Sequence, residues 1–148
     1  HFVAVESAAQ MLAACTAAPA DVFIGVAAVA DYRVTETAPQ KLKKQAATLE
    51  LTLVRNPDIL ATIAAGTPRP FCVGFAAETE NVTVNAKAKL LAKKLDLIFA
   101  NEATGTFGQD HASVTALWPG GERALPEGSK DQLARQMVDL IGTRLRER

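Results

Sequence analysis

Two lysines spaced four residues apart are the clearest candidates for anion binding in this sequence. Lys89 and Lys93 fall in a segment with helical periodicity, so their ammonium groups project from the same side of the predicted helix. Together they could hold a chain of phosphates. The alternative is a solvated basic face, since exposed lysines are common on helices. The spacing alone leaves both interpretations open.

Other charged residues occur where predicted strands end or where regular periodicity is lost. Lys41, Lys43 and Lys44 lie in an irregular stretch, where a lysine could close over a nucleotide and offset charge that develops during attack on phosphorus or an acyl carbon. Asp31 follows a long apolar run and could bind a ribose hydroxyl, an amino group or magnesium. A surface charge cluster and a simple turn or helix cap are the respective alternatives.

The remaining candidates have weaker chemical patterns. Phe75 lies near a predicted strand end, where its ring could pack against a base or simply fill the core. Cys15, Cys72 and His111 form no triad and no metal-ligand spacing, so we interpret all three as structural. The sequence contains neither a Gly-x-Gly-x-x-Gly fingerprint after a strand nor a Walker loop. From the residues alone, the sequence predicts a nucleotide-binding-like α/β domain.

The elements that must position these residues alternate between strands and helices. Continuous apolar runs predict buried strands at residues 22–29, 71–75 and 97–100. Helical patterns and caps predict helices at residues 7–18, 58–63, 81–95 and 129–146. Irregular composition predicts a flap over residues 32–48, and alternation predicts a strand at 49–54 and a hairpin over 113–125. The order predicts a Rossmann-like three-layer α/β/α fold with a mainly parallel sheet.

Composition limits the possible partners and cellular setting. The chain has 148 residues, of which 49% are apolar, enough for one domain with a real core. Lys plus Arg and Asp plus Glu each number 16, so no net charge would attract the chain to nucleic acid or a membrane surface. Only two cysteines occur, and no apolar run approaches the roughly 20 residues of a membrane helix. We therefore expect a soluble cytoplasmic protein.

Five motifs in order resemble one family. They are residues 27–33 (AAVADYR), 41–44 (KLKK), 56–60 (NPDIL), 74–79 (GFAAET) and 95–101 (LDLIFAN). Together they resemble phosphopantothenoylcysteine synthetase, which in bacteria is usually the carboxyl-terminal half of a bifunctional synthetase and decarboxylase. The motifs extend over nearly the whole chain and are far more specific than a lone glycine pattern.

The resemblance implies a two-step ligation with CTP, phosphopantothenate and cysteine as substrates. The phosphopantothenate carboxylate attacks the α-phosphorus of CTP and releases pyrophosphate, and the cysteine amine then attacks the acyl-cytidylate and releases CMP. Mg²⁺ accompanies CTP and needs no dedicated protein ligands, and FMN belongs only to the decarboxylase portion, which is not in this sequence. A homodimer and an upstream decarboxylase domain are the implied protein partners. No protein nucleophile is needed, because the nucleotide supplies the activation.

The resemblance also implies a role for particular residues in holding the nucleoside. Small side chains at the first strand end line the nucleotide, namely Gly25, Val26 and Ala27. Asp31 matches the family's acidic nucleotide contact. One segment reads the cytosine through its backbone, namely Pro57, Asp58, Ile59 and Leu60. Phe75 matches the aromatic residue beside the base.

The basic residues take their roles from the same resemblance. Lys89 and Lys93 match the family's phosphate-binding lysines. Lys41 matches the flap lysine that acts in turnover of the acyl-cytidylate, and it is the one predicted catalytic residue. The resemblance makes a merely solvated face a weaker explanation of these lysines.

One departure from the family pattern affects what the chain can do alone. Family domains begin with an earlier strand and a Gly-rich segment, and neither is found here, so we expect residues 1–148 to be a single domain forming the later part of a synthetase domain. Such a fragment should be weak or inactive as a ligase. The alternatives are a noncatalytic nucleotide-binding or dimerisation fragment and a nicotinamide-dependent oxidoreductase, although the missing dinucleotide fingerprint counts against the second.

Overall fold

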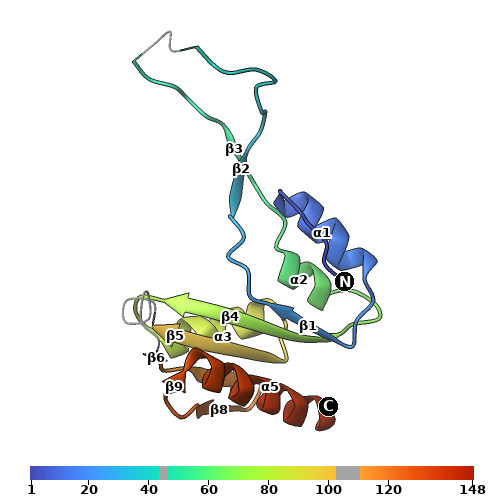
Figure 1. Cartoon of the computed structure of the whole chain (residues 1–148), viewed down its shortest axis with the longest axis vertical. Helices are drawn as coiled ribbons and strands as arrows, with labels where there is room; N and C mark the ends of the chain where they lie inside the picture. The colour runs from blue at the N-terminus through green and yellow to red at the C-terminus, as the bar shows by residue number, and fades with distance from the viewer. Residues whose placement is uncertain (44–46, 103–110) are drawn as a thin grey trace. The chain divides into compact units, whose positions relative to one another are not determined.

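The structure divides the chain into two compact units (Figure 1). It is a computed structural model that describes residues 1–43, 47–102 and 111–148. Unit 1 comprises His1–Ala18 and Ala27–Ile59, and unit 2 comprises Pro19–Val26 and Leu60–Arg148. Two predictions lie outside the described part of the chain, namely the flap position of Lys44 and the structural role of the His111 side chain.

Unit 2 is built on a five-stranded sheet. Its strands, in spatial order, are β1 (Val22–Gly25), β4 (Phe71–Glu78), β5 (Leu97–Glu102), β7 (Thr115–Trp118) and β8 (Gly121–Ala124). β1, β4 and β5 pair in parallel, whereas β7 pairs antiparallel with both β5 and β8. β8 therefore runs in the same direction as β5, and β7 is the reversed strand of this sheet. The predicted mainly parallel α/β sheet and the predicted hairpin are confirmed.

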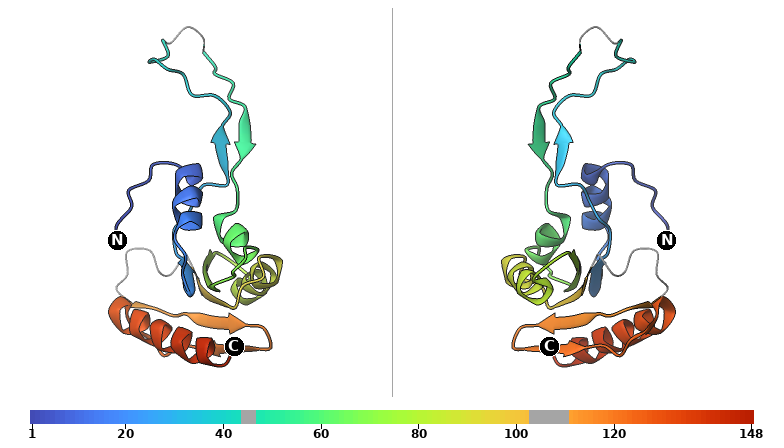
Figure 2. Two further views of the ribbon diagram at one scale, coloured as in Figure 1. Left: turned by 90° about the vertical axis from the view of Figure 1, so that its right-hand side faces the viewer. Right: turned by 90° about the vertical axis from the view of Figure 1, so that its left-hand side faces the viewer.

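Helices cover both faces of this sheet (Figure 2). α2 (Ile59–Ala64) and α3 (Val82–Ala92) contribute apolar side chains to the core on one face, and α5 (Lys130–Arg146) covers the other. The layers follow from strand alternation, because successive side chains of β4 point to opposite faces. Cys72 and Ala76 pack on the α3 side, whereas Phe71 and Val73 pack on the α5 side. A short pair of strands, β6 (His111–Ala112) and β9 (Gly128–Ser129), precedes α5.

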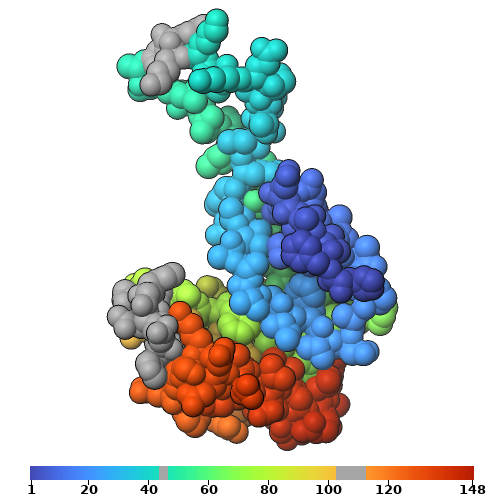
Figure 3. Space-filling view, viewed as in Figure 1, coloured from blue at the N-terminus to red at the C-terminus, as the bar shows by residue number. Residues whose placement is uncertain are grey.

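Helix α5 begins and packs as its sequence predicts. Ser129 accepts a hydrogen bond from the backbone of Gln132, and the Gln132 side chain accepts one from the Ser129 backbone, which completes a capping box. Leu133, Leu140 and Ile141 form the buried stripe against the sheet. The opposite side of α5 is open to solvent and is visible in red along unit 2 in the space-filling view (Figure 3). This helix therefore closes the core on its face of the sheet.

Helix α3 ends in a turn that brings the chain back to the sheet. The backbone N–H of Lys94 donates to Leu91, and that of Leu95 donates to Leu90, which is the hydrogen-bond pattern of a Schellman motif. Lys94 has a φ of 54°, in the left-handed region that this turn requires. Leu90 and Leu95 pack in the same core cluster. The turn thus sets the start of β5 directly after the helix.

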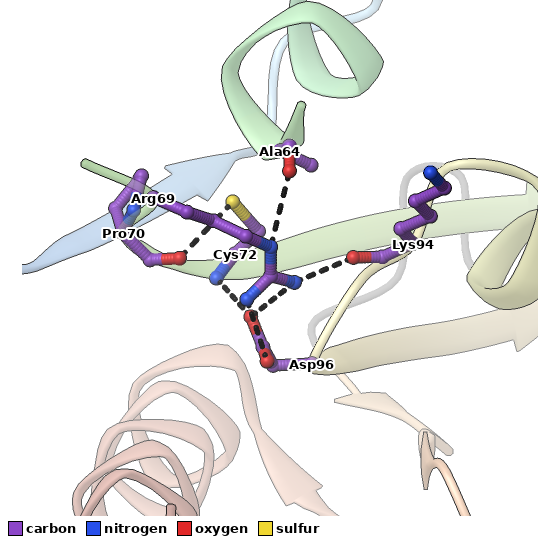
Figure 4. A network of polar contacts seen from close by, with 6 residues as sticks. All are labelled: Ala64, Arg69, Pro70, Cys72, Lys94 and Asp96. Carbon is purple, nitrogen blue, oxygen red and sulfur yellow. Dashed lines mark hydrogen bonds and ion pairs between the residues drawn. The ribbon is translucent and has the colours of Figure 1, made fainter. Parts of the chain in front are cut away.

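An arginine and an aspartate lock together the segments before β4 and β5 (Figure 4). Arg69 Nη2 lies 2.9 Å from Asp96 Oδ2, and Nη1 donates to Asp96 Oδ1 at 3.1 Å. The same guanidinium donates to the carbonyl of Ala64 through Nε and to that of Lys94 through Nη2. Asp96 Oδ2 also accepts from the backbone N–H of Cys72 at 2.7 Å. One bidentate ion pair therefore ties together α2, β4 and the end of α3.

Unit 1 consists of one helix and one antiparallel pair of short strands. α1 (Ala8–Ala17) starts with a capping box between Ser7 and Gln10, and it has no buried residue. β2 (Tyr32–Val34) pairs with β3 (Leu53–Arg55). We call the chain from Tyr32 to Arg55 the ribbon. All of its described residues are exposed.

Several predicted elements differ from the structure in extent, most of all those around the first strand and the ribbon. The strand predicted at residues 22–29 ends at Gly25, because β1 pairs only with β4 and that pairing stops at Gly74. Val26 is 64% exposed, so an apolar run in the sequence does not by itself show that all of its residues are buried. The strand predicted at 49–54 is confined to Leu53–Arg55, and the start of the predicted flap is strand β2. An apolar run indicates which segment can pack in a core. The strand ends where its backbone no longer has hydrogen-bonding partners on a neighbouring strand.

Candidate functional site

The carboxyl ends of three parallel strands form one edge of the unit 2 sheet. β1 ends at Gly25, β4 ends at Glu78 and β5 ends at Glu102. Glu78 and Glu102 are register partners, so two acidic residues stand side by side at this edge. In open α/β sheets, ligands bind outside the carboxyl ends of the strands. Residues on these strand ends are therefore the first to consider as a site in unit 2.

Two glycines on neighbouring strands make room for α2. A Cβ atom added at Gly25 would lie 3.3 Å from Leu60 Cδ1, and one added at Gly74 would lie 3.1 Å from Leu60 Cδ2. The Cβ at Gly74 would also lie 2.8 Å from Leu95 Cδ1, closer than real Cβ contacts. The side chain of Leu60 thus packs on the sheet. The predicted backbone contact of Leu60 with the nucleotide stays a prediction.

Phe75 opens onto a hollow on the α5 face of the sheet. Its ring lies 5.3 Å from the ring of Phe99, centroid to centroid, with the planes tilted by 42°. The hollow has a volume of about 200 Å³ and a mostly apolar wall. Its lining comprises Phe75, Phe99, Asn101, Val114, Lys130, Leu133, Ala134 and Met137. A flat aromatic face beside an amide and an ammonium group suits the ring of a nucleobase.

Asn101 and Lys130 line this hollow but are not among the site residues predicted from the sequence. The position of Asn101 at the end of a buried strand is a local signal that marks it as a candidate. Lys130 has no such signal, because it becomes a neighbour of Phe75 only when α5 packs across the sheet. A residue contributed by a helix distant in sequence is visible only in the folded chain.

Lys89 lies on the other face of β4 and is already paired. Its ammonium Nζ lies 2.5 Å from Glu78 Oε1. The Lys89 side chain is 47% exposed, whereas that of Glu78 is only 14% exposed. Asn85 donates to the second carboxylate oxygen of Glu78 at 3.3 Å. The sequence marks Glu78 only as an acidic residue after a predicted strand, and its pairing with Lys89 appears only in the folded chain.

Lys93 lies one turn further along α3. It is the C-cap of the helix and is half-buried, and its backbone N–H donates to the carbonyl oxygen of Lys89 at 3.0 Å. The four-residue spacing places the side chains of Lys89 and Lys93 on the same side of the helix, as the sequence predicts. Both side chains therefore start on one side of α3, from which Lys89 reaches Glu78.

The structure separates the aromatic and basic groups of unit 2 by one layer of sheet. Phe75 packs with the core under α5, whereas Glu78 and Lys89 meet on the α3 side. The alternation of side chains along β4 is the cause, because residues 75 and 78 differ by an odd number. A ligand that contacts both groups has to pass around the carboxyl edge of the sheet.

In unit 1, Asn56 brings two of the predicted motifs together. Its backbone N–H donates to the carbonyl of Asp31 at 2.7 Å, and its side-chain amide donates to the carbonyl of Ala30 at 2.9 Å. Arg33 Nη1 donates to Asn56 Oδ1 at 3.0 Å and to the carbonyl of Arg55. Asp31 is thereby fixed beside the start of the predicted base-reading segment. Asn56 is a positioning residue that the sequence identifies only as part of a turn.

The other predicted site residues of unit 1 are mostly exposed. Ala27, Pro57, Asp58 and Lys41 are all open to solvent, whereas Ile59, the first residue of α2, is 7% exposed. Lys41 lies on the ribbon beyond β2 and has no regular secondary structure around it. Pro57 and Asp58 follow Asn56 directly. Unit 1 therefore presents an acidic group, a backbone segment and a lysine to solvent.

Cys72 is a structural thiol. It is fully buried, and burial raises the pKa of its thiol above the ordinary value of 9.0, an effect opposed by Arg69, increased by Asp96 and opposed by Arg148. Because the thiolate is the reactive form, a raised pKa makes this group a poor nucleophile. The role inferred from the sequence is the one its environment supports.

Residues 1–43, 47–102 and 111–148 contain no cluster of three or more His, Cys, Asp or Glu side chains placed to hold a metal ion. In the same part of the chain, no helix combines the length and apolar character needed to cross a membrane.

Comparison with known protein families gives one match over nearly the whole chain. Residues 1–145 match the family model described as the DNA/pantothenate metabolism flavoprotein C-terminal domain. Among curated proteins, the coenzyme A biosynthesis bifunctional protein CoaBC of Vibrio vulnificus (strain YJ016) is 47% identical over an alignment 148 residues long. The alignment covers 94% of this chain and 37% of that protein. CoaBC of Escherichia coli (strain K12) is 43% identical and is covered to 38%, with 99% of this chain aligned. The chain thus spans little more than a third of these relatives.

Two solved structures share the fold. The crystal structure of the C-terminal domain of the coenzyme A biosynthesis bifunctional protein CoaBC has a TM-score of 0.79 and 34% identity, covering 99% of this chain and 66% of that chain. The DNA/pantothenate metabolism flavoprotein from Streptococcus pneumoniae has a TM-score of 0.72 at 17% identity, covering 95% of this chain and 69% of that chain, and this match concerns the fold alone.

Proposed function

The chain belongs to the DNA/pantothenate metabolism flavoprotein C-terminal domain family, and from that premise we propose that it carries the ligase activity joining phosphopantothenate to cysteine in coenzyme A synthesis. Identity of 43% to 47% with bifunctional CoaBC proteins over most of this chain is the observation that carries the proposal. The five sequence motifs predicted the same family independently. Because the chain spans 37% or 38% of those relatives, the upstream decarboxylase and its FMN belong to the remainder of the polypeptide in this proposal.

The proposed reaction uses CTP as the activating nucleotide. A carboxylate oxygen of phosphopantothenate forms a bond to the α-phosphorus, the bond to the β-phosphate oxygen breaks, and pyrophosphate leaves. The neutral amine of cysteine then attacks the acyl carbon, CMP leaves as the acyl–oxygen bond breaks, and the amine loses a proton to solvent. The protein contributes binding, orientation and charge compensation.

In unit 2, we assign the base to the Phe75 hollow and the phosphates to the α3 lysines. The volume of about 200 Å³ and the apolar wall suit a pyrimidine, and the side chain of Asn101 lines the same hollow. Lys89 and Lys93, on one side of α3, are assigned to the positive charge that the phosphates need. Gly25 and Val26, at the end of β1, leave backbone groups accessible to the nucleotide.

In unit 1, the proposed contributions come from three segments. Asp31, held by Asn56, is assigned to a ribose hydroxyl or an amino group of the substrates. The backbone of Pro57 and Asp58 is assigned to the base, with Ile59 and Leu60 continuing the segment into α2. Ala27 lines the nucleotide with its small side chain. Lys41 is assigned to the charge that develops as the acyl-cytidylate forms and breaks down.

Magnesium enters the proposal with the nucleotide. The described residues present no cluster of three metal-binding side chains, so Mg²⁺ would be held chiefly by the triphosphate oxygens and water. Its chemistry would be to neutralise charge on the phosphates during attack. The lysines of α3 would then share the compensation of the remaining charge.

We further propose that the ribbon pairs with a second copy of this chain. Its exposed large apolar residues are Tyr32, Val34, Leu42, Leu49, Leu51, Leu53 and Val54. Exposed apolar residues in this number on one segment are unusual for a free surface. Sedimentation of the complete polypeptide should therefore give a dimer, and Leu51→Glu with Leu53→Glu should give a smaller species. An unchanged dimer in that variant would exclude the ribbon as the interface.

The ligase proposal is tested with the complete polypeptide, CTP, phosphopantothenate and cysteine. Equal release of pyrophosphate and CMP, dependent on all three substrates, is the expected result. Lys41→Gln should lower turnover by about 100-fold or more, since it removes charge compensation at the reacting centre. Lys43→Gln, on the same exposed segment, should change turnover by less than about threefold.

Undiminished turnover in Lys41→Gln would remove Lys41 from the mechanism. A polypeptide that binds CTP without releasing CMP would instead be the noncatalytic form of this domain. Preferential binding of NAD over CTP would replace the ligase with nicotinamide chemistry.

A further inference from the structure

The ion pair at the end of β4 joins a buried acid to an exposed base. Glu78 Oε1 lies 2.5 Å from Lys89 Nζ, with side-chain exposures of 14% and 47%. Asn85, one turn before Lys89 on α3, donates to Glu78 Oε2 at 3.3 Å and to the carbonyl of Glu80 at 3.1 Å. Each carboxylate oxygen of Glu78 therefore has its own donor. The acid is fixed by the fold, and the lysine is the partner that can move.

A second ion pair on the same helix shows what is particular to the first. Lys87 Nζ lies 2.8 Å from Glu122 Oε2, with exposures of 55% and 49%. That acid comes from β8 and borders a different hollow, formed with Trp118 and the Pro119–Gly120 turn. Both of its partners are free to rotate into solvent. Glu78 differs because its carboxylate is held in place at the sheet edge where ligands gather.

The pairing changes what an approaching phosphate encounters. An unpaired Lys89 would present a full positive charge, whereas the pair is neutral in sum. A phosphate that takes hydrogen bonds from Lys89 must draw the ammonium from Glu78 or share it, while the fixed carboxylate repels the ligand. This repulsion grows with ligand charge, so pyrophosphate and CTP experience more of it than CMP does. Glu78 thus weakens polyphosphate binding most.

We propose that Glu78 is a displaceable counter-ion that gives up Lys89 to the nucleotide phosphates and recovers it as pyrophosphate leaves. Glu78 is then a positioning residue, because it acts through Lys89 and not on the reacting atoms. The inference rests on the phosphate-binding role assigned to Lys89 under the proposed function. Its consequence is that phosphate binding is kept weak enough for product release.

The test measures pyrophosphate and CMP binding to the complete polypeptide by calorimetry. Glu78→Gln should tighten pyrophosphate binding by about five- to tenfold, because it removes the repelling charge and the competing partner. CMP binding should change by less than about twofold, since a single phosphate has less charge to repel. Glu78→Asp, which keeps the charge, should remain within about threefold of the wild type. A purely structural role would not separate the two ligands in this way.

Glu122→Gln is the matched control. It breaks the other ion pair of α3, and it should leave pyrophosphate binding unchanged. In the ligase assay, Glu78→Gln should lower both the KM for CTP and kcat, which is the pattern expected when binding tightens and release slows. Lys89→Gln should weaken pyrophosphate binding whether residue 78 is Glu or Gln.

Several outcomes would overturn the inference. Unchanged or weaker pyrophosphate binding in a folded Glu78→Gln variant would do so, as would pyrophosphate affinity in Lys89→Gln equal to that of the wild type. If Glu78→Gln fails to fold, the NMR signal of the Lys89 Nζ ammonium group in the wild type tests the proposal. That signal should shift when pyrophosphate is added. An unmoved signal would refute the exchange. If pyrophosphate binding changes as expected but no CMP is formed, the ligase function is refuted and the counter-ion role of Glu78 stands.

Discussion

Unit 2 buries its apolar residues within itself, whereas unit 1 leaves its own open to solvent. In unit 2, side chains from both faces of the sheet are enclosed by helices, and Leu97, Phe99 and Leu117 are at most 1% exposed. Among the described residues of unit 1, Ile59 alone is buried, while Leu49 and Leu51 are 69% and 61% exposed. The two regions therefore pack their apolar residues in opposite ways.

This difference indicates that unit 2 provides stability, whereas unit 1 provides a surface for assembly. Burial of apolar surface is the main favourable term in folding, so unit 2 provides most of the stability of this chain. Unit 1 has local caps and a short ribbon, but it lacks an interior of its own. Its exposed apolar residues require another surface for cover. We have proposed that a second copy supplies it.

The largest expected contrast is in the reactivity of the two thiols. Cys72 is fully buried, and burial raises the pKa of its thiol, whereas Cys15 is half-buried on a helix without a buried residue. Cys72 should react with a maleimide more slowly than Cys15 by about 1000-fold or more, since it requires opening of the core. Mass spectrometry of timed samples measures both rates. Comparable rates would mean that unit 2 opens as readily as unit 1.

The same thiol predicts a pH dependence of stability. Folding raises the pKa of Cys72, so the folded state holds this proton more tightly than the unfolded chain does. The contribution is fully present below the ordinary value of 9.0 and is lost as pH rises through the higher folded pKa. Urea unfolding should therefore show falling stability above pH 9.0, and Cys72→Ala should flatten that decline. An identical decline in the variant would assign it to other groups.

Next in size is the loss of a core leucine. Leu97→Ala should lower the free energy of unfolding by about 2 to 5 kcal/mol, because it leaves a cavity between the sheet and α5. Leu53→Ala, at a position that is 55% exposed, should change it by no more than about 0.5 kcal/mol. Urea denaturation followed by circular dichroism measures both. A large cost for Leu53→Ala would show that the ribbon is covered in solution.

Two arginines with similar hydrogen bonds give a smaller contrast. Arg69→Met should cost about 2 to 3 kcal/mol, because it leaves the mostly buried Asp96 without its charged partner. Arg33→Met removes hydrogen bonds to Asn56 and the carbonyl of Arg55, but at an exposed site, and should cost less than about 1 kcal/mol. Thermal melts of the two variants, compared in one buffer, measure the difference. Equal costs would contradict the division of stability between the units.

The smallest expected effect concerns close packing within unit 2. Gly74→Ala should cost about 1 to 3 kcal/mol, since its Cβ would crowd Leu60 and Leu95. Gly142→Ala, on α5, would meet only the end of the Arg146 side chain at 3.6 Å and should gain about 0.5 to 1 kcal/mol from helix propensity. Denaturation midpoints distinguish loss from gain. A neutral Gly74→Ala would mean that α2 shifts away from the sheet easily.

Much of the fold was predictable because its signals are local. The capping box at Ser129 and the apolar stripe from Leu133 to Ile141 predict α5 almost to the residue. The alternation of strands and helices predicts the parallel core of the sheet and both helical layers. Strand ends were less predictable, and β1 stops at Gly25 although the apolar run continues to Val29. Hydrogen-bonding partners set that limit, and they come from distant segments.

The candidate site shows the same boundary between local and distant information. The sequence determined which residue types are available, including Lys89 and Lys93 on one side of a helix, since that follows from the period of the helix. Only the tertiary structure placed Phe75 and Lys89 on opposite sides of the sheet. It also brought Lys130 to the Phe75 hollow and Glu78 to Lys89. Periodicity acts along the chain, whereas such contacts depend on how strands and helices distant in sequence pack together.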